Sequence, residues 1–204
     1  MYLIELSDKE IKRRSSEIRI LLGILLTKEE TAKRGEKTTI SCNTYPQAQH
    51  YILGTYDGSI PNKSYRDWRF TCYNTEFRCM YFEDWVPSDL AKTKWALNNL
   101  SFSLFRVLRQ SRDEREVLAI HCEPRETEPA DKTIKSHYQY KRIPHLHVSL
   151  ATQPLPHSHF ALHHTNDISM MKNIESLTSF MRNVLVMIKD EVIDTNDKEW
   201  KINT

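Results

Sequence analysis

The stretch HYQYKRIPHLHVSLATQPLPHSHFALHH, residues 137–164, carries the strongest structural pattern of the chain. Within it, residues 145–150 alternate polar and apolar side chains, which is typical of a β-strand with one buried face. Residues 152–156 include two prolines and indicate a loop, and the alternation returns over 157–163. The sequence therefore predicts an antiparallel β-hairpin, around which the rest of the fold is arranged.

The spacing of the histidines predicts that they share one face of this hairpin. Seven of the nine histidines of the chain lie within 137–164. Successive side chains of a strand point to opposite faces, so odd-numbered positions stay together under any even shift of the register. With the turn centred on position 154, His147 is expected opposite Ala161, and His145 opposite His163. The four odd-numbered histidines expected on one face are His145, His147, His159 and His163.

A face that carries several imidazoles suits metal binding or proton transfer. Neutral imidazole is the commonest metal ligand, and it titrates near neutral pH. His145 and His147 are therefore the candidate catalytic residues and metal ligands, with Glu123, at the end of a predicted strand, as a candidate general base. The other candidate metal ligands are His137, His159 and His163. The alternative interpretation is that these histidines are exposed or structurally hydrogen-bonded.

Composition narrows the classes of protein. A chain of 204 residues with 39% hydrophobic residues can build one core, and one domain is expected. The four glycines all lie at or before position 58 and are too scattered for a phosphate-binding loop, so no nucleotide cofactor is expected. The four cysteines form no C-x-x-C pair and are interpreted as reduced core residues of a cytoplasmic protein: Cys42, Cys72, Cys79 and Cys122.

Hydropathy predicts no membrane segment. The apolar run Ile20–Leu26 is much shorter than the ~20 residues that cross a bilayer. It lies in a helix predicted from a capping box, Ser7-Asp8-Lys9-Glu10, to about Arg34. The aliphatic Leu21–Leu26 stripe is expected to face the core or a partner.

The remaining elements follow from periodicity and turn residues. Residues 38–164 are expected to form a sheet with one inserted helix, which Ser88 and Asp89 would begin and which would end near Gln110. The predicted core stripe of that helix is Leu90, Leu97, Leu100, Leu104, Phe105 and Leu108. A further amphipathic helix is expected over 169–193.

Two basic segments suggest a substrate that carries phosphate. One combines aromatic and basic residues on predicted strands: Tyr65, Arg66, Trp68, Arg69, Tyr73 and Arg78. Such surfaces can stack bases and hold phosphates. The other leads into the histidine hairpin and contains Lys132, Lys135, Lys141 and Arg142. The alternative for both segments is that their charged side chains are simply solvated at the surface.

The segment Pro144-His145-Leu146-His147-Val148 resembles the H-hydrophobic-H strand of HUH endonucleases. In that family a histidine pair or triad binds a divalent metal and a tyrosine attacks the phosphate. The chain departs from the family pattern, because the final predicted helix contains no tyrosine and position 138 is tyrosine where relaxases carry an acid. This departure leaves a more general metal-dependent chemistry as the expectation.

We therefore expect a single α+β domain, a mostly antiparallel sheet of about six strands covered by three amphipathic helices. The leading hypothesis is metal-assisted phosphodiester chemistry on a nucleotide or nucleic acid, with Zn, Mn or Mg at the histidine hairpin. One alternative is a non-catalytic accessory or scaffold subunit that binds a protein partner, or itself, through the Leu21–Leu26 helix or the C-terminal helix. Another is a nucleic-acid-binding module.

Overall fold

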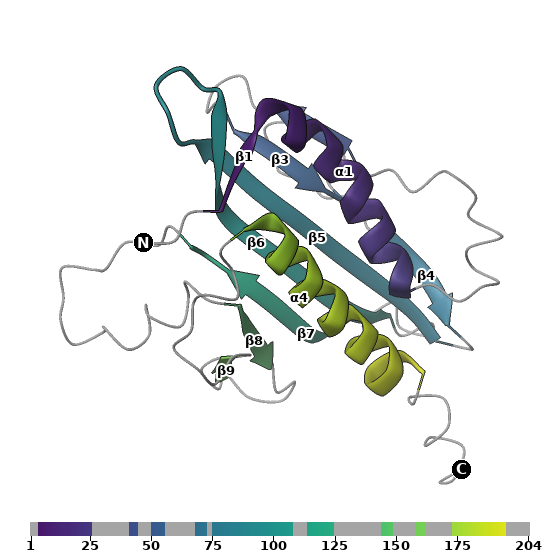
Figure 1. The fold of residues 1–204 in the computed structure, drawn as a ribbon. Helices are drawn as coiled ribbons and strands as arrows, with labels where there is room; N and C mark the ends of the chain where they lie inside the picture. The colour runs from purple at the N-terminus through teal and green to yellow at the C-terminus, as the bar shows by residue number, and fades with distance from the viewer. Residues whose placement is uncertain are drawn as a thin grey trace, which may run out of the picture.

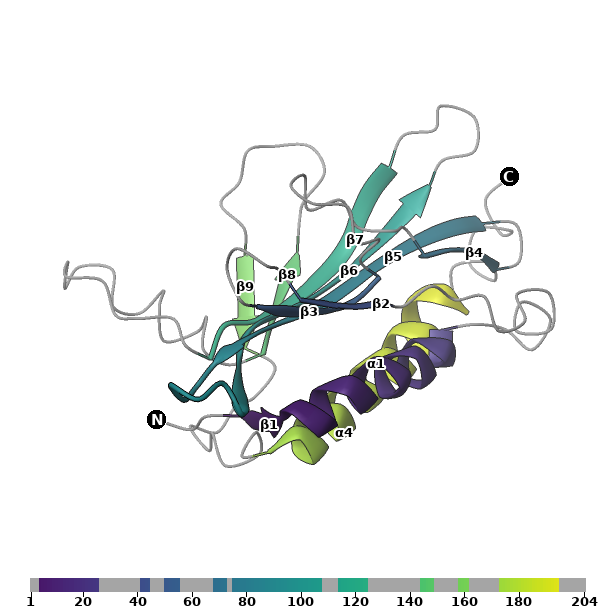
Figure 2. The ribbon, with the colours of Figure 1, turned by 90° about the horizontal axis from the view of Figure 1, so that it is seen from above.

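The fold is built on one sheet with two helices on one of its faces (Figures 1 and 2). The computed structural model describes residues 4–25, 41–44, 50–55, 68–72, 75–107, 114–124, 144–148, 158–161 and 173–194. All the strand pairs are antiparallel. The α+β class and the antiparallel sheet agree with the sequence prediction.

The sheet runs in the order β2-β3-β5-β6-β7-β8-β9, with β1 paired to β6 and β4 paired to β5. The strands are β1 (Glu5–Ser7), β2 (Ser41–Thr44), β3 (Tyr51–Gly54), β4 (Trp68–Cys72), β5 (Thr75–Pro87), β6 (Lys94–Val107), β7 (Glu114–Cys122), β8 (His145–Val148) and β9 (Ser158–Ala161). The helices are α1 (Asp8–Leu22), followed by the 3-10 turn η1 (Gly23–Leu25), and α4 (Ile174–Met187), continued by the π-helical η4 (Ile188–Ile193).

Helix α1 begins with the predicted capping box. The Ser7 side chain accepts from the Glu10 amide, and the Glu10 carboxylate accepts from the Ser7 amide at 2.8 Å. Asp8, at the first helical position, accepts a hydrogen bond from Lys12 and one from the Tyr51 hydroxyl of β3, and these bonds hold the pKa of Asp8 below its usual range. The cap therefore also fixes α1 to the sheet.

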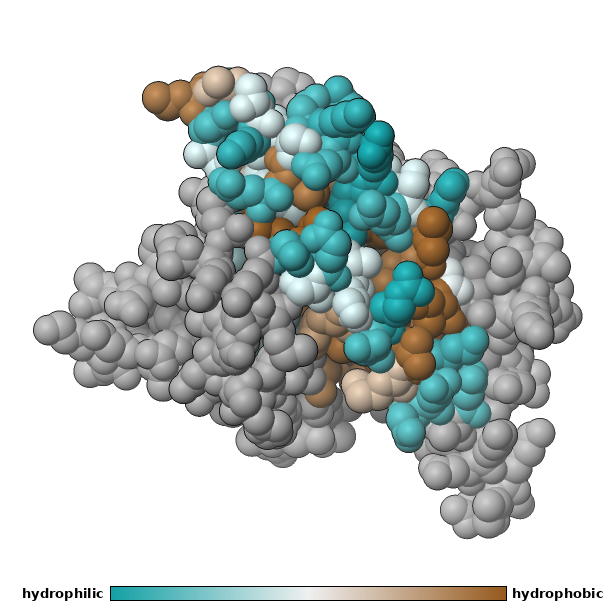
Figure 3. All heavy atoms as spheres, in the orientation of Figure 1, coloured by the Kyte–Doolittle hydropathy of each residue, from teal (hydrophilic) through white to brown (hydrophobic). Residues whose placement is uncertain are grey.

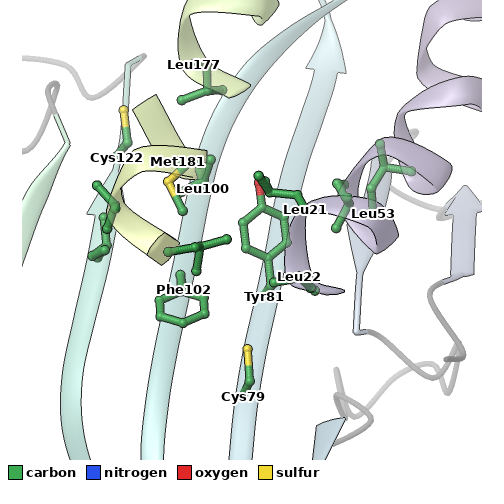
Figure 4. Packing of buried hydrophobic residues seen from close by; sticks show 14 of the residues in the cluster. Leu21, Leu22, Leu53, Cys79, Tyr81, Leu100, Phe102, Cys122, Leu177 and Met181 are labelled. Carbon is green, nitrogen blue, oxygen red and sulfur yellow. The ribbon is translucent and has the colours of Figure 1, made fainter. Parts of the chain in front are cut away.

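The apolar side of α1 is covered by the chain itself. Leu21, Leu22 and Leu25 are at most 1% exposed and belong to the main core (Figure 4). For these three residues, the prediction that the Leu21–Leu26 stripe faces the core is confirmed. Helix α1 ends at Leu22 and continues as a 3-10 turn, and the predicted helix end near Arg34 lies outside the described residues.

The predicted inserted helix was wrong: Lys94–Val107 is strand β6, at the centre of the sheet. Its inward residues follow period 2 in two runs, Trp95 and Leu97, then Leu100, Phe102 and Leu104. A β-bulge separates the runs, since Trp85 pairs with Leu97 while Asp84 pairs with Asn99. The extra residue reverses whether odd- or even-numbered positions face the core. The inward residues of the two runs together therefore have the three- and four-residue spacing of a helix.

The residues that were predicted to cap this helix form a hairpin turn instead. Asp89 Oδ1 accepts from the amides of Thr93 at 2.8 Å and Lys94 at 3.2 Å. An aspartate side chain satisfies backbone amides equally well in a turn and at a helix start, so the residue type did not separate the two. Leu90, predicted to be in the core, is fully exposed at the turn.

Helix α4 starts one turn later than the predicted position 169. Asn173 is its N-cap and accepts from the Ser176 amide at 2.9 Å. Its buried residues, Leu177, Met181, Val184 and Leu185, pack on the sheet beside α1 (Figure 4). The predicted helical stripe of this segment is confirmed.

Candidate functional site

The candidate site lies on the face of the sheet opposite α1 and α4, which we call the outer face (Figure 2). On β5, Tyr81 and Glu83 point toward the helices, and Glu83 contacts Arg14 of α1. Phe82, between them, therefore points outward. The strand pairing places Phe82 in a row of directly opposed residues that crosses the sheet. The row continues through Ser101, His121, His145 and Ala161.

The adjacent outer row holds two more of the predicted histidines. Ala119 of β7 pairs with His147 of β8, which pairs with His159 of β9. The predicted partner of His147 was Ala161, so the observed register is shifted by two residues. This even shift keeps the backbone positions of His145, His147 and His159 on one side of the sheet, and the predicted cluster of their side chains stays a prediction. His137 and His163 lie outside the described residues.

Two imidazoles of the site are placed in detail. The rings of His121 and His145 have their centroids 6.1 Å apart and are inclined at 36°. Two imidazoles that share one tetrahedral zinc ion, at about 2.1 Å per Zn–N bond, hold their centroids roughly 5.3 Å apart. The observed separation is longer than that value. No three histidine, cysteine or acidic side chains are arranged to hold a metal among the residues that the structure describes.

The burial of this row distinguishes it from a solvent-exposed surface. His145 is 2% exposed and Ser101 is 8% exposed, although both lie on the outer face. A polar residue in such a position is uncommon in the absence of a structural or functional role. The alternative interpretation of His145 as an exposed histidine is therefore wrong.

Glu123, the predicted general base, follows the last residue of β7 and lies two positions beyond His121. It is half-buried. On the neighbouring strand, the Asn99 side chain has a buried Oδ1 with no hydrogen bond from the described residues. The register places His121 of β7 directly opposite His145.

The structure also shows a histidine–carboxylate pair that sequence reasoning missed. His50 Nδ1 lies 2.9 Å from Asp84 Oδ1, and Asn98 Nδ2 donates to Asp84 Oδ2 at 2.9 Å. His50 directly precedes β3 and Asp84 lies in β5, so β6 and β7 lie between the pair and His145 on β8. His50 and Asp84 are 34 residues apart, and no local spacing could have indicated the contact.

A second polar cluster lies on the helix face and is completely buried. Arg14 of α1 and Glu83 of β5 are both 0% exposed, with Arg14 Nη2 2.7 Å from Glu83 Oε1. Glu83 also accepts from the Tyr81 hydroxyl and from Trp85 Nε1. Arg14 Nη1 donates to Thr178 of α4 at 2.7 Å, so the cluster joins both helices to the sheet.

This buried cluster is electrostatically self-consistent. Burial by itself lowers the pKa of the Arg14 guanidinium, but the surrounding charges and hydrogen bonds, with Glu83 the largest among them, together offset that effect, and the net pKa is raised. Burial, followed by the charge of Glu83, raises the pKa of the Tyr81 hydroxyl. Arginine therefore stays charged and tyrosine neutral, which is the arrangement of a structural ion pair rather than of a group that exchanges protons during a reaction.

The predicted basic and aromatic surface is divided between the two faces. Arg69 pairs with Arg78, which pairs with Phe105 on the outer face, whereas Trp68 pairs with the core residue Cys79. The Arg78 guanidinium lies 4.5 Å from the centre of the Phe105 ring. Arg78 is thus stacked on an aromatic ring, and Tyr65, Arg66 and Tyr73 lie outside the described residues.

Two of the four cysteines are placed in detail. Cys79 and Cys122 are free and fully buried. Burial raises the pKa of both thiols, and the charge of Glu123 adds to this effect at Cys122. For these two, the interpretation as reduced core residues is confirmed.

Comparisons of the chain with protein-family models, with curated proteins and with solved structures find no match. None of the helices within the described ranges is long and apolar enough to cross a membrane. The function is therefore argued from the geometry of the outer face.

Proposed function

We propose that the outer-face histidines form a divalent-metal site that acts on the phosphodiester of a nucleotide or nucleic acid. The observation that carries the proposal is the register of β7, β8 and β9. It brings four histidines from three strands into two adjacent rows on one face: His121, His145, His147 and His159. Directly opposed residues in such rows have Cβ atoms about 4.5–5.5 Å apart, which is within reach of a shared ion.

The residue types favour zinc over manganese or magnesium. Imidazole is a good ligand for zinc, whereas magnesium prefers oxygen ligands. In this proposal His145 and His147 bind the ion with one or both of His121 and His159, while His137 and His163 stay candidate ligands from the sequence. The bound ion would polarise the phosphate and activate water, and Glu123 would accept the proton from that water.

The proposal is tested by metal analysis and hydrolysis together. The purified chain is dialysed against zinc or manganese, its metal content is measured by mass spectrometry, and cleavage of bis(p-nitrophenyl) phosphate is followed. We expect bound metal and hydrolysis in the wild type, and loss of both in His145→Ala and His147→Ala. His50→Ala is the matched control, because His50 lies on a distant strand and pairs with Asp84.

Two results would contradict the proposal. One is a wild-type chain that retains no metal; the other is a His145→Ala/His147→Ala variant whose metal content equals that of the wild type. Circular dichroism of each variant shows whether the loss of metal reflects an altered site or an unfolded chain.

A second candidate function, a non-catalytic accessory subunit, is favoured by apolar side chains on the helices. Ile20 of α1 is 64% exposed, and Val186 and Met187 of α4 are 42% and 48% exposed. The same metal analysis separates the two functions. An accessory role is supported when the wild type binds no metal and hydrolyses no diester.

A further inference from the structure

The β5–β6 hairpin ends in a projecting tip that carries an apolar side chain into solvent. Leu90 is fully exposed, and the residues from Ala91 to Lys94 that follow it are exposed as well. The tip is the teal loop at the upper left of Figure 1, and Figure 3 shows hydrophobic atoms at its end. Among the described residues, none packs over the Leu90 side chain.

The tip is held in one conformation by its own hydrogen bonds. The Lys92 amide donates to the Asp89 carbonyl at 3.2 Å, and the Asp89 side chain accepts from the Thr93 amide, the Thr93 hydroxyl and the Lys94 amide. A preformed loop loses little conformational entropy when it binds. Leu90 is thus presented at low entropic cost.

Lys92 gives the tip its positive charge. Its φ is +56°, in the left-handed region that hairpin turns use. A lysine at this position places a positive charge one residue beyond Ala91 and close to Leu90.

The far end of the molecule offers a surface of matching chemistry. Val186 and Met187 are exposed near the end of α4, and Asp190 follows Met187 by one turn. Continuing α4, η4 contains the acids Asp190 and Glu191 beside one basic residue, Lys189, so it carries a net negative charge near the negative end of the helix dipole, where negative charge is unfavourable. A positive group docked there would relieve that repulsion.

We propose that the hairpin tip of one copy of this chain docks on the end of α4 of a second copy. Leu90 would contact Val186 and Met187, and Lys92 would pair with Asp190. The tip and the end of α4 lie at opposite ends of the molecule, so they meet only between chains (Figure 1).

This contact joins two different surfaces, so it is head-to-tail. Such contacts add further copies until a ring closes or a filament grows, whereas a two-fold dimer stops at two. Because the contact involves few side chains of each copy, it is weak, and the extent of association depends on protein concentration. The inference does not depend on the proposed metal site.

The experiment is sedimentation velocity over a range of concentrations, with two single variants and their mixture. We expect the wild type to form species heavier than a dimer, and Leu90→Ser and Met187→Ser each to stay monomeric. An equimolar mixture of the two variants is expected to form a 1:1 dimer and nothing heavier, because one intact tip meets one intact helix end. Both substitutions replace exposed side chains, so folding is expected to be unchanged.

A charge reversal adds a matched control. Lys92→Glu is expected to weaken association at least several-fold, and Lys9→Glu, which makes the same change at an exposed position of α1, is expected to leave it unchanged. The proposal is overturned if the wild type is monomeric at all concentrations, if Leu90→Ser associates like the wild type, or if the mixture stays monomeric. Association of Met187→Ser alone would indicate a tip-to-tip contact and would equally overturn it.

Discussion

Arg14→Met is the substitution that most directly tests the origin of the fold's stability. Arg14 and Glu83 are both fully buried, and removal of one partner from a buried ion pair costs about 3–5 kcal/mol, because the other charge is left uncompensated. In the variant, the Glu83 carboxylate would retain only the hydrogen bonds from Tyr81 and Trp85. We expect a loss of about 4 kcal/mol from the free energy of unfolding, a large part of the ~5–15 kcal/mol typical of a domain.

The double variant Arg14→Met/Glu83→Gln distinguishes a coupled pair from two independent losses. Without a charge on either side, no unpaired ion stays buried, and such replacements are often close to neutral. We expect the double variant to be more stable than the sum of the single changes predicts, by about 2–3 kcal/mol.

Urea unfolding at pH 7, followed by circular dichroism, measures these free energies. Arg13→Met is the matched control, because Arg13 is exposed on the same helix; its effect is expected within about 0.5 kcal/mol. The reasoning is refuted if Arg14→Met costs less than about 1 kcal/mol, or if the two single effects simply add.

The remaining predictions concern backbone, pH and thiols. Gly54→Ala should cost more than about 2 kcal/mol, because Gly54 has φ +140° and a Cβ there would lie 2.1 Å from the Tyr81 carbonyl oxygen; Gly23→Ala, with nothing within 4 Å, should be neutral or stabilising in the same urea assay. Asp8→Asn should lower stability at neutral pH. Because the folded pKa of Asp8 lies below the unfolded one, the contribution is complete above about pH 5 and is lost as the pH falls through the folded pKa, so the two unfolding curves should converge in strong acid. Cys79 and Cys122 should resist iodoacetamide until the chain is unfolded, as mapped by mass spectrometry, since burial raises the pKa of both thiols; rapid labelling of the native chain would contradict their placement in the core.

The histidine face could be predicted from sequence because period 2 tolerates an error in the turn. The predicted register was shifted by two residues, yet the backbone positions of His145, His147 and His159 stayed on one side. The capping box of α1 was equally local and equally predictable. Patterns that are completed within a few residues need no knowledge of the rest of the fold.

Strand β6 could not be predicted for the opposite reason. The bulge opposite Asp84 and Trp85 depends on pairing with a neighbouring strand, and without it Leu97, Leu100 and Leu104 have helical spacing. The Arg14–Glu83 pair is likewise invisible in sequence, because its members are 69 residues apart and both types are usually exposed. Contacts between distant segments decide these features.

The two faces of the sheet differ in a way that bears on function. On the helix face, the one charged cluster among the described residues is fully buried, and the Glu83 carboxylate is bonded by Arg14, Tyr81 and Trp85. On the outer face, the row through Ser101, His121 and His145 is polar, although Ser101 and His145 are buried. A polar row in this position adds little to stability, since cross-strand apolar and aromatic pairs would contribute more. Substitutions on the helix face should therefore act through the free energy of unfolding, and substitutions of the outer-face histidines through binding.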